Sequence, residues 1–472
     1  MSPSQGFSRR RFLEIAGVAG GVVALRQSLL PLRIAEAAPG KAPLLLSVYF
    51  EGGWDPLIAL DPRDTTDPRF QRDSAYSAGG SGLHVAYDML QNNDVRAVLQ
   101  QTPSGVQKRG NLSFGPAVAP SLMDHFQDLA VVRGVNMDTL THEVGRRYFI
   151  TGKMPRGLTA SGSSAGTAVA AQAGQDAVIP NLAVGTEAYN ETFASFASPV
   201  RVNVAADMLN VLRPLGNELP PASQAAIEAY EAATTTCEHD LYDSDGLVTA
   251  LKASRKRARG FAAGNVATLF QFNPLQPAPE VKGLFSALKI TTNADLTGPK
   301  GRAAIAAQAL ANGLSQAVSV VLAQGLDAHF DWTTNHPTLQ RAAWDALGNL
   351  ITYLKNTRYK NTNDSVWSHT TLVAFSEFSR TPLLNSRDGR DHHLASSCLV
   401  GGPGIRGNFV CGGTSDNRMS ALATNFNTGQ VDEQKGQAIR PADVHATLFK
   451  AMGLSWDHIS NQTPQLLGAL LK

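Results

Sequence analysis

Five short apolar runs along the chain have the pattern of buried β-strands, at residues 43–50, 128–135, 319–323, 371–375 and 397–402. Nearly continuous apolar runs are typical of strands that are covered on both faces. Helical patterns lie between them, at residues 166–173, 222–234, 302–316, 339–356 and 441–453. This alternation predicts an α/β fold with a mostly parallel central sheet and helices on both faces.

The middle of the chain has a different pattern. Residues 160–166 are rich in Ser and Gly, and residues 272–279 are rich in Pro. Such segments interrupt regular elements. We therefore expect residues 38–472 to form one large α/β domain, in which residues 160–300 are a helical insertion that covers the sheet edge or the functional site.

The N-terminal residues have the features of an export signal. Residues 8–13, SRRRFL, fit the twin-arginine pattern S-R-R-x-F-L, an apolar stretch follows at residues 15–25, and residues 35–37 read A-E-A, an A-x-A cleavage pattern. The apolar stretch is shorter than the ~20 residues that span a bilayer. Residues 1–37 are therefore predicted to be a signal peptide. The mature chain is expected to be exported folded by the twin-arginine machinery, into the periplasm or the medium.

Charge and cysteine content exclude several classes of protein. The predicted leader holds five Arg and two Glu, so the mature chain keeps 36 basic and 37 acidic residues. This balance gives no electrostatic reason to expect nucleic-acid binding, and no later apolar run is long enough for a stable membrane span. The three cysteines, Cys237, Cys398 and Cys411, lack the spacing of a thiolate zinc site. After export, a Cys398–Cys411 bridge and separate thiols are both open.

Acidic and imidazole side chains follow three of the predicted strands. Asp55 comes after the first strand, Asp327 and His329 after the third, and Glu377 after the fourth. The loop beyond Glu377 adds Asp391, His392 and His393. Because the carboxyl ends of parallel strands share one edge of a sheet, these groups are expected to meet there. Oxygen and nitrogen ligands without thiolate suit zinc, manganese, magnesium or calcium. For Asp55, a role in a glycine-rich turn is an equal alternative.

The segment after the second predicted strand resembles the active-site motif of sulfatases, which belong to the alkaline phosphatase superfamily. That motif reads C-x-P-S-R-x-x-x-x-T-G-x-x-P, and its spacing is matched by Arg146, Thr151, Gly152 and Pro155. His142 stands where sulfatases have the Cys that becomes formylglycine. A formylglycine mechanism is therefore not predicted.

A closer resemblance is to DUF1501, an exported bacterial family that is sulfatase-like in sequence. It rests on the twin-arginine leader and on five motifs, which read GGWD at 52–55, THE at 141–143, DAH at 327–329, SEFSRTP at 376–382 and DHH at 391–393. This chain departs from the family pattern at three positions: Trp54-Asp55-Pro56 replaces N-D-G, Thr141 replaces Ser, and His393 replaces Gly.

The resemblance implies an alkaline phosphatase-like three-layer sandwich and a metal-dependent hydrolase of phosphate or sulfate esters. One or two divalent ions would be held by Asp55, Asp327, His329, Glu377, Asp391 and His392, with His393 beside them. Phe378 stands where alkaline phosphatases have a His ligand, which favours a single ion or a weakened second metal site.

The resemblance also implies roles around the metal. Thr141, next to His142 at the nucleophile position, is the nucleophile candidate, and a metal-bound water could serve instead. A helix cap is the alternative role of Thr141. Arg146 or Arg380 would bind the anionic oxygens, with structural ion pairs as the alternative. The expected substrate is a small anionic ester or a sulfated or phosphorylated glycan. A catalytically inactive exported binding or assembly protein on the same fold is the competing interpretation.

Overall fold

The computed structural model describes residues 42–212, 220–234, 266–360 and 362–472. The predicted leader, its cleavage pattern and Cys237 lie outside these residues. An eight-stranded sheet with the order β12-β4-β11-β8-β1-β7-β5-β6 forms the centre of the molecule. The strands are β1 Leu44–Phe50, β4 Leu129–Asn136, β5 Asn181–Val184, β6 Val200–Val202, β7 Ala317–Ala323, β8 Thr370–Phe375, β11 Ala395–Gly401 and β12 Phe409–Gly412. All five predicted strands belong to this sheet.

The strands of this sheet run in one direction, except for β11. β1 is parallel to β7 and β8, β5 is parallel to β7 and β6, and β12 is parallel to β4. β11 lies between β4 and β8 and is antiparallel to both. The carboxyl ends of β1, β4, β7 and β8 therefore meet at one edge of the sheet, where the amino end of β11 also lies.

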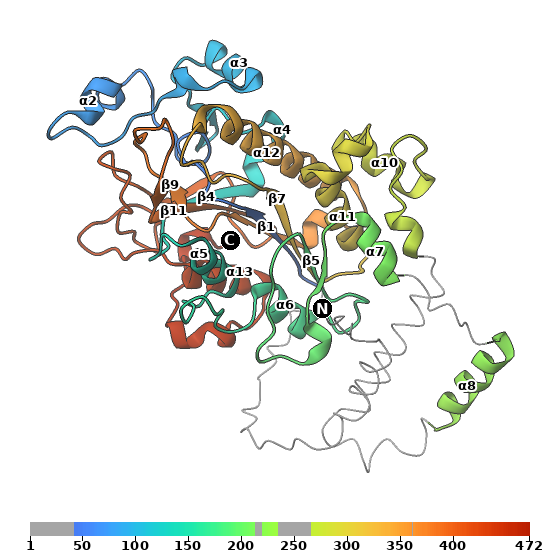
Figure 1. Cartoon of the computed structure of the whole chain (residues 1–472). Coiled ribbons are helices and arrows are strands. Elements are labelled where there is room, and N and C mark those ends of the chain that lie inside the picture. The colour runs from blue at the N-terminus through green and yellow to red at the C-terminus, as the bar shows by residue number, and fades with distance from the viewer. Residues whose placement is uncertain (1–41, 213–219, 235–265, 361) are drawn as a thin grey trace, which may run out of the picture. The chain divides into compact units, whose positions relative to one another are not determined.

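Helices cover both faces of the sheet (Figure 1). α11 (Pro299–Ala311) and α12 (Trp332–Asn356) pack on one face, while α5 (His142–Thr151), α6 (Ala165–Ala173) and α13 (Pro441–Met452) pack on the other. The side chains of β1 alternate accordingly, because successive residues of a strand point to opposite faces. Leu46 and Val48 join the core under α11 and α12, and Leu45 and Tyr49 join the core under α5 and α6.

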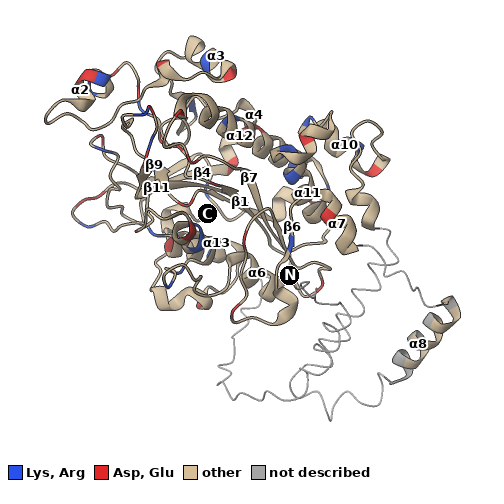
Figure 2. Cartoon of the chain, in the orientation of Figure 1, with Lys and Arg blue, Asp and Glu red and all other residues tan. Residues whose placement is uncertain are grey.

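The central strands carry almost no charge. β1, β5, β7, β8 and β11 contain no Lys, Arg, Asp or Glu, and Figure 2 shows the charged residues mainly on the surrounding helices and loops. This composition follows from burial on both faces, where an unpaired charge is costly. The predicted α/β class with a mostly parallel sheet is thus confirmed.

The described part of the segment 160–300 is not helical throughout. It supplies β5 and β6 to the main sheet, as well as α7 (Ala205–Leu212), α8 (Pro221–Thr234) and α10 (Pro279–Leu288). α12 begins at Trp332, before the predicted start, and contains Pro337. Smaller elements are α2 Arg72–Tyr76, α3 Asn93–Gln101, α4 Pro120–Met123, β2 Gln107–Arg109, β3 Leu112–Phe114, β9 Ser379–Arg380 and β10 His392–His393.

Cys398 and Cys411 are buried free thiols. Cys398 of β11 and Cys411 of β12 both pair with Val132, which lies on the strand between them. Two strand spacings amount to about 9 Å, whereas a disulfide needs Cα atoms less than about 7 Å apart. The bridge left open by the sequence does not fit this sheet.

Among the helices of the described residues, none combines the length and the apolar composition that a bilayer span requires.

Candidate metal centre

The candidate centre lies at the edge of the sheet where β1, β4, β7 and β8 end. Gly52 follows β1, His142 opens α5 after β4, Asp327 follows β7, and Glu377 follows β8. His392 forms part of β10, just before β11. Because β11 is antiparallel, this segment also lies at the same edge. Placement at the carboxyl ends of strands is the usual position of sites in open α/β sheets.

Three side chains form the core of the centre: His142, Asp327 and His392. One ligand atom from each lies within 4.8 Å of the others. The Asp327 carboxylate is 3.5 Å from His142 Nε2 and 3.6 Å from His392 Nε2. His329 adds a third imidazole, with Nε2 at 3.2 Å from Asp327 Oδ1 and 2.9 Å from His392 Nε2. Three Nε2 atoms therefore converge on one carboxylate.

The other ring nitrogen of each imidazole faces an oxygen acceptor. His142 Nδ1 donates to Glu377 Oε1 at 2.9 Å, His329 Nδ1 to Asp391 Oδ1 at 2.7 Å, and His392 Nδ1 to the Leu140 carbonyl at 2.6 Å. An acceptor at Nδ1 fixes the tautomer that leaves Nε2 unprotonated, and metal-bound histidines are held in this way. Two imidazoles and one carboxylate are also a common ligand set of catalytic zinc sites. The residues present therefore fit a divalent cation.

Glu377 and Arg380 fix the positions of the candidate metal-binding side chains His142 and Asp327. The Glu377 side chain is fully buried, and it accepts from the Gly52 N–H at 2.8 Å and the Ser376 hydroxyl at 2.9 Å. Arg380 is buried as well, and its guanidinium donates to Asp327 Oδ1 at 2.5 Å and to the carbonyls of Gly52 and Gly53. Both side chains therefore position the centre instead of facing a substrate.

Gly52 is required for this close approach. Its φ is +109°, and a Cβ atom there would lie 2.6 Å from the Asp327 backbone nitrogen. Any other residue would be strained in this conformation and would push β1 away from the segment that carries Asp327.

The charges around the centre set its protonation. Burial opposes ionisation of Asp327, but the hydrogen bond and positive charge of Arg380, together with the charges of His142 and His329, lower the pKa of Asp327 overall. Burial lowers the pKa of His392, as do nearby positive charges such as Arg380. Burial also opposes a charge on His142, but the Glu377 carboxylate raises the pKa of His142 above its ordinary value. At neutral pH the centre thus contains an ionised Asp327 and a neutral His392.

Phe378 closes the centre on its apolar side. Its buried ring lies 4.7 Å from the His142 ring and 4.2 Å from the His392 ring. An aromatic ring offers no ligand atom, so this position cannot complete a second metal site.

Asp55 lies outside this cluster, in contrast to the prediction. Its carboxylate is fully buried and forms an ion pair with Arg390 at 3.0 Å, and it accepts from the Leu57 N–H at 2.8 Å. The Arg390 guanidinium is also fully buried. A carboxylate engaged in this way is a structural partner, so the turn-forming alternative describes Asp55 better than the role of ligand.

The remaining predicted residues have varied surroundings. Arg146 donates to Glu187 Oε1 at 2.7 Å, in a structural ion pair. His393 points away from the cluster, with Nε2 bonded to the Arg418 carbonyl at 2.9 Å. Thr141 is the exposed N-cap of α5, and its side chain makes no capping hydrogen bond. Asp391 reaches the centre through His329 only.

Two contributors were not found from the sequence. The Leu140 carbonyl orients His392, but a backbone carbonyl leaves no sequence signal because every residue has one. Arg390 stands in the run RDGRDHH beside the predicted ligands. Its partner in the structure is Asp55 and not the adjacent Asp391, so the sequence around Arg390 does not indicate this buried ion pair.

Residues 276–466 match the model of a family described as protein of unknown function (DUF1501). The chain is therefore similar to this family over 191 of its 472 residues. The predicted resemblance is confirmed over this part of the chain. The matched residues include Asp327, His329, Glu377, Arg380 and His392, so they supply the whole cluster except His142.

Among the solved structures that are similar to this chain, two are of the same protein, Ps i-CgsB. "Crystal structure of Ps i-CgsB in complex with k-i-k-neocarrahexaose" is 9% identical, with 91% of this chain and 76% of that chain covered at a TM-score of 0.38. "Crystal structure of Ps i-CgsB" is 10% identical with the same coverage at a TM-score of 0.33. Comparison with curated proteins gave no match.

Proposed function

We propose that this protein is an exported hydrolase of phosphate or sulfate esters that uses one divalent cation at the His142–Asp327–His392 centre. The observation that carries the proposal is the orientation of the three imidazoles. Each Nδ1 donates to a fixed oxygen, so that all three Nε2 atoms face Asp327. We also propose that the three-layer architecture is of the alkaline phosphatase type, because the centre lies at the carboxyl edge of a mostly parallel sheet. The export in this proposal is based on the predicted signal peptide at residues 1–37.

The chain's own residues would share the work as follows. His142, Asp327 and His392 would hold the cation, with His329 in reach, Glu377 and Asp391 orienting two imidazoles, and Arg380 keeping Asp327 ionised. A bound divalent cation would polarise an ester oxygen and lower the pKa of a bound water. His142 is the first residue of α5, so the positive end of that helix also faces an anionic ester.

Thr141 is the candidate nucleophile in this proposal. Its hydroxyl is exposed immediately before His142 and makes no hydrogen bond in the described part of the chain. We expect Thr141→Ser to keep esterase activity and Thr141→Ala to lose it. If Thr141→Ala is fully active, water is the nucleophile and Thr141 is a helix boundary residue.

A non-catalytic exported binding or assembly protein is the second candidate. It is favoured by the engagement of both predicted anion-binding arginines. Arg146 is paired with Glu187, and Arg380 is buried against Asp327 and backbone carbonyls. Each of these guanidinium groups is already paired with a carboxylate in this arrangement.

Metal content and turnover separate the two candidates. We expect the exported protein to contain about one equivalent of a divalent ion and to hydrolyse members of a panel of aryl phosphates and sulfates. His142→Ala and Asp327→Ala should lose both the metal and the activity, and Glu377→Gln should weaken metal affinity by about 10- to 100-fold. His393→Ala is the matched control, because that imidazole faces the Arg418 carbonyl. Metal below about a tenth of an equivalent in the folded protein would refute the hydrolase, since a catalytic site of this kind binds a full ion.

A further inference from the structure

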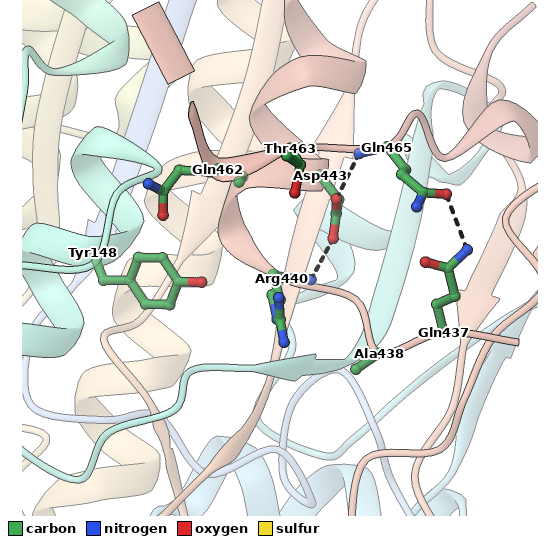
Figure 3. A pocket seen from close by; sticks show the side chains of 9 residues that line it. Tyr148, Gln437, Ala438, Arg440, Asp443, Gln462, Thr463 and Gln465 are labelled. Carbon is green, nitrogen blue, oxygen red and sulfur yellow. Dashed lines mark hydrogen bonds between the residues drawn. The ribbon is translucent and has the colours of Figure 1, made fainter. Parts of the chain in front are cut away.

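A polar cavity of about 350 Å³ lies between α5 and the N-terminal end of α13 (Figure 3). Its walls include Tyr148 of α5, Arg440 and Asp443 at the start of α13, and Gln462 and Thr463 from the turn that follows. The volume is at the small end of the range of ligand pockets, about 300–1,000 Å³. Most ligand pockets are chiefly apolar, whereas this one is lined by hydroxyl, amide and charged groups. A ligand that fits it is therefore small and hydrophilic.

Some of the polar groups in the wall are already used within the protein. The Asp443 carboxylate accepts from the backbone N–H groups of Arg440 at 2.9 Å and Gln465 at 2.8 Å. Gln437 donates to the Gln465 side chain at 3.0 Å. These bonds fix the shape of the cavity. They also engage its one carboxylate, so Asp443 is not available to bind a cation.

Other groups in the wall remain available. The Tyr148 hydroxyl and the Gln462 amide make no hydrogen bond to the residues that the structure describes, and Figure 3 shows the hydroxyl pointing toward Arg440. The nearest carboxylate to the Arg440 guanidinium is Asp138, 3.9 Å away, and the Arg440 side chain is 58% exposed. Burial raises the pKa of Tyr148 to about 12, so its hydroxyl remains a donor at neutral pH. The cavity thus offers one cation and several neutral hydrogen-bonding groups.

The cavity is linked to the candidate metal centre through a short segment of chain. Asp138, which is near Arg440, lies two residues before Leu140, whose carbonyl accepts from His392 Nδ1 at 2.6 Å. Two residues of chain span at most about 7 Å. The strand that leads into this connection is fixed to the same wall, because the Asn136 N–H donates to the Ile439 carbonyl at 2.8 Å. One extended substrate could therefore reach both places.

We propose that this cavity binds one anionic saccharide unit, with its acid group on Arg440 and its hydroxyls on Tyr148, Gln462 and Thr463. A guanidinium suits a carboxylate or sulfate because it offers paired donors. In the hydrolase this unit belongs to the same glycan substrate as the ester at the metal centre, and that substrate role rests on the function proposed above. The binding itself does not depend on it.

Direct binding to the metal-free, full-length mature protein tests the proposal. The probes are glucuronate, glucose and inorganic sulfate, followed by titration calorimetry or ligand-observed NMR. We expect glucuronate to bind with a Kd of about 1 mM and glucose about tenfold more weakly, with no measurable binding of sulfate. Arg440→Ala should weaken glucuronate binding at least tenfold, and Tyr148→Phe should weaken it severalfold. Arg96→Ala is the matched control, because Arg96 is an exposed arginine on α3 that does not line the cavity.

Three results would overturn the proposal. These are no binding of glucuronate, binding that Arg440→Ala leaves unchanged, and binding of inorganic sulfate as tight as that of glucuronate, which would mark a simple anion site. Arg440 and Tyr148 lie outside the metal cluster, so both variants should keep the metal content of the parent protein. Loss of metal binding would refute the hydrolase alone, whereas loss of glucuronate binding would refute the saccharide site alone.

Discussion

The buried pair of Asp55 and Arg390 allows the role of Asp55 to be tested sharply. Both side chains are fully buried, and their charged groups are 3.0 Å apart. Asp55→Asn removes the negative charge but keeps the size of the side chain and an oxygen that can accept from the Leu57 N–H. The variant therefore leaves the Arg390 charge buried without its partner.

The expected loss of stability follows from this arrangement. Removal of one partner from a buried ion pair costs about 3–5 kcal/mol. Arg390 keeps its hydrogen bonds to the carbonyls of Thr381 and His84, both at 2.9 Å, and its position over the Trp332 ring. These contacts partly compensate the remaining charge, so we expect a decrease of about 3 kcal/mol in the free energy of unfolding.

Denaturant unfolding and metal analysis of the same preparations distinguish a structural role of Asp55 from a role as metal ligand. We expect Asp55→Asn to unfold at a lower denaturant concentration and to keep the metal content of the parent protein. The double variant Asp55→Asn/Arg390→Met should be less destabilised than the sum of the two single variants, because the pair is coupled. If Asp55→Asn loses its metal while its stability is unchanged, Asp55 is a ligand and the structural interpretation is refuted.

Two further predictions concern the stability of the fold. Burial raises and Arg133 lowers the pKa of Asp61, and the net effect, with Arg63, is a lowered pKa. The stabilisation by ionised Asp61 is therefore complete above the unfolded pKa of about 3.9 and is lost as the pH falls from there through the lower pKa of the folded state. Asp61→Asn should therefore have a lower free energy of unfolding at pH 7, and this free energy should fall less steeply with decreasing pH than in the parent protein. An unchanged pH dependence would contradict this. Gly52→Ala should destabilise the fold by more than about 1 kcal/mol, because its φ is +109° and its Cβ would meet Asp327. Gly283→Ala in α10, where nothing lies within 4 Å of the new Cβ, should be neutral or stabilising.

Much of the sheet could be predicted from the sequence because its central strands are buried on both faces. β1 and β8 are continuous apolar runs, and this pattern depends on local sequence alone. β5 and β6, with four and three residues, are too short for a periodic signal. The early start of α12 was missed because Pro337 normally marks a helix boundary, although it lies only five residues after Trp332, near the first turn.

The candidate site could be predicted in part, for a related reason. Asp327 and Glu377 each follow a strand that was recognised, so their place at the carboxyl edge follows from the fold. Asp55 follows a strand as well, but its carboxylate turns to Arg390, which is more than three hundred positions away in the sequence. The choice between a ligand and an ion-pair partner depends on that contact, and the pattern around Asp55 does not contain it.

The antiparallel direction of β11 determines where the sequence around this centre can accept insertions. Because β8 and β11 are antiparallel neighbours, the chain from Ser376 to Leu394 leaves and re-enters the sheet at one edge and needs no crossover helix. Glu377, Arg380 and His392 therefore all lie on the one hairpin-like connection between β8 and β11. Insertions in the loop between these two strands would reshape the rim of the centre while β8 and β11 stay in register, so this segment can vary in length without moving His142 or Asp327, which follow other strands.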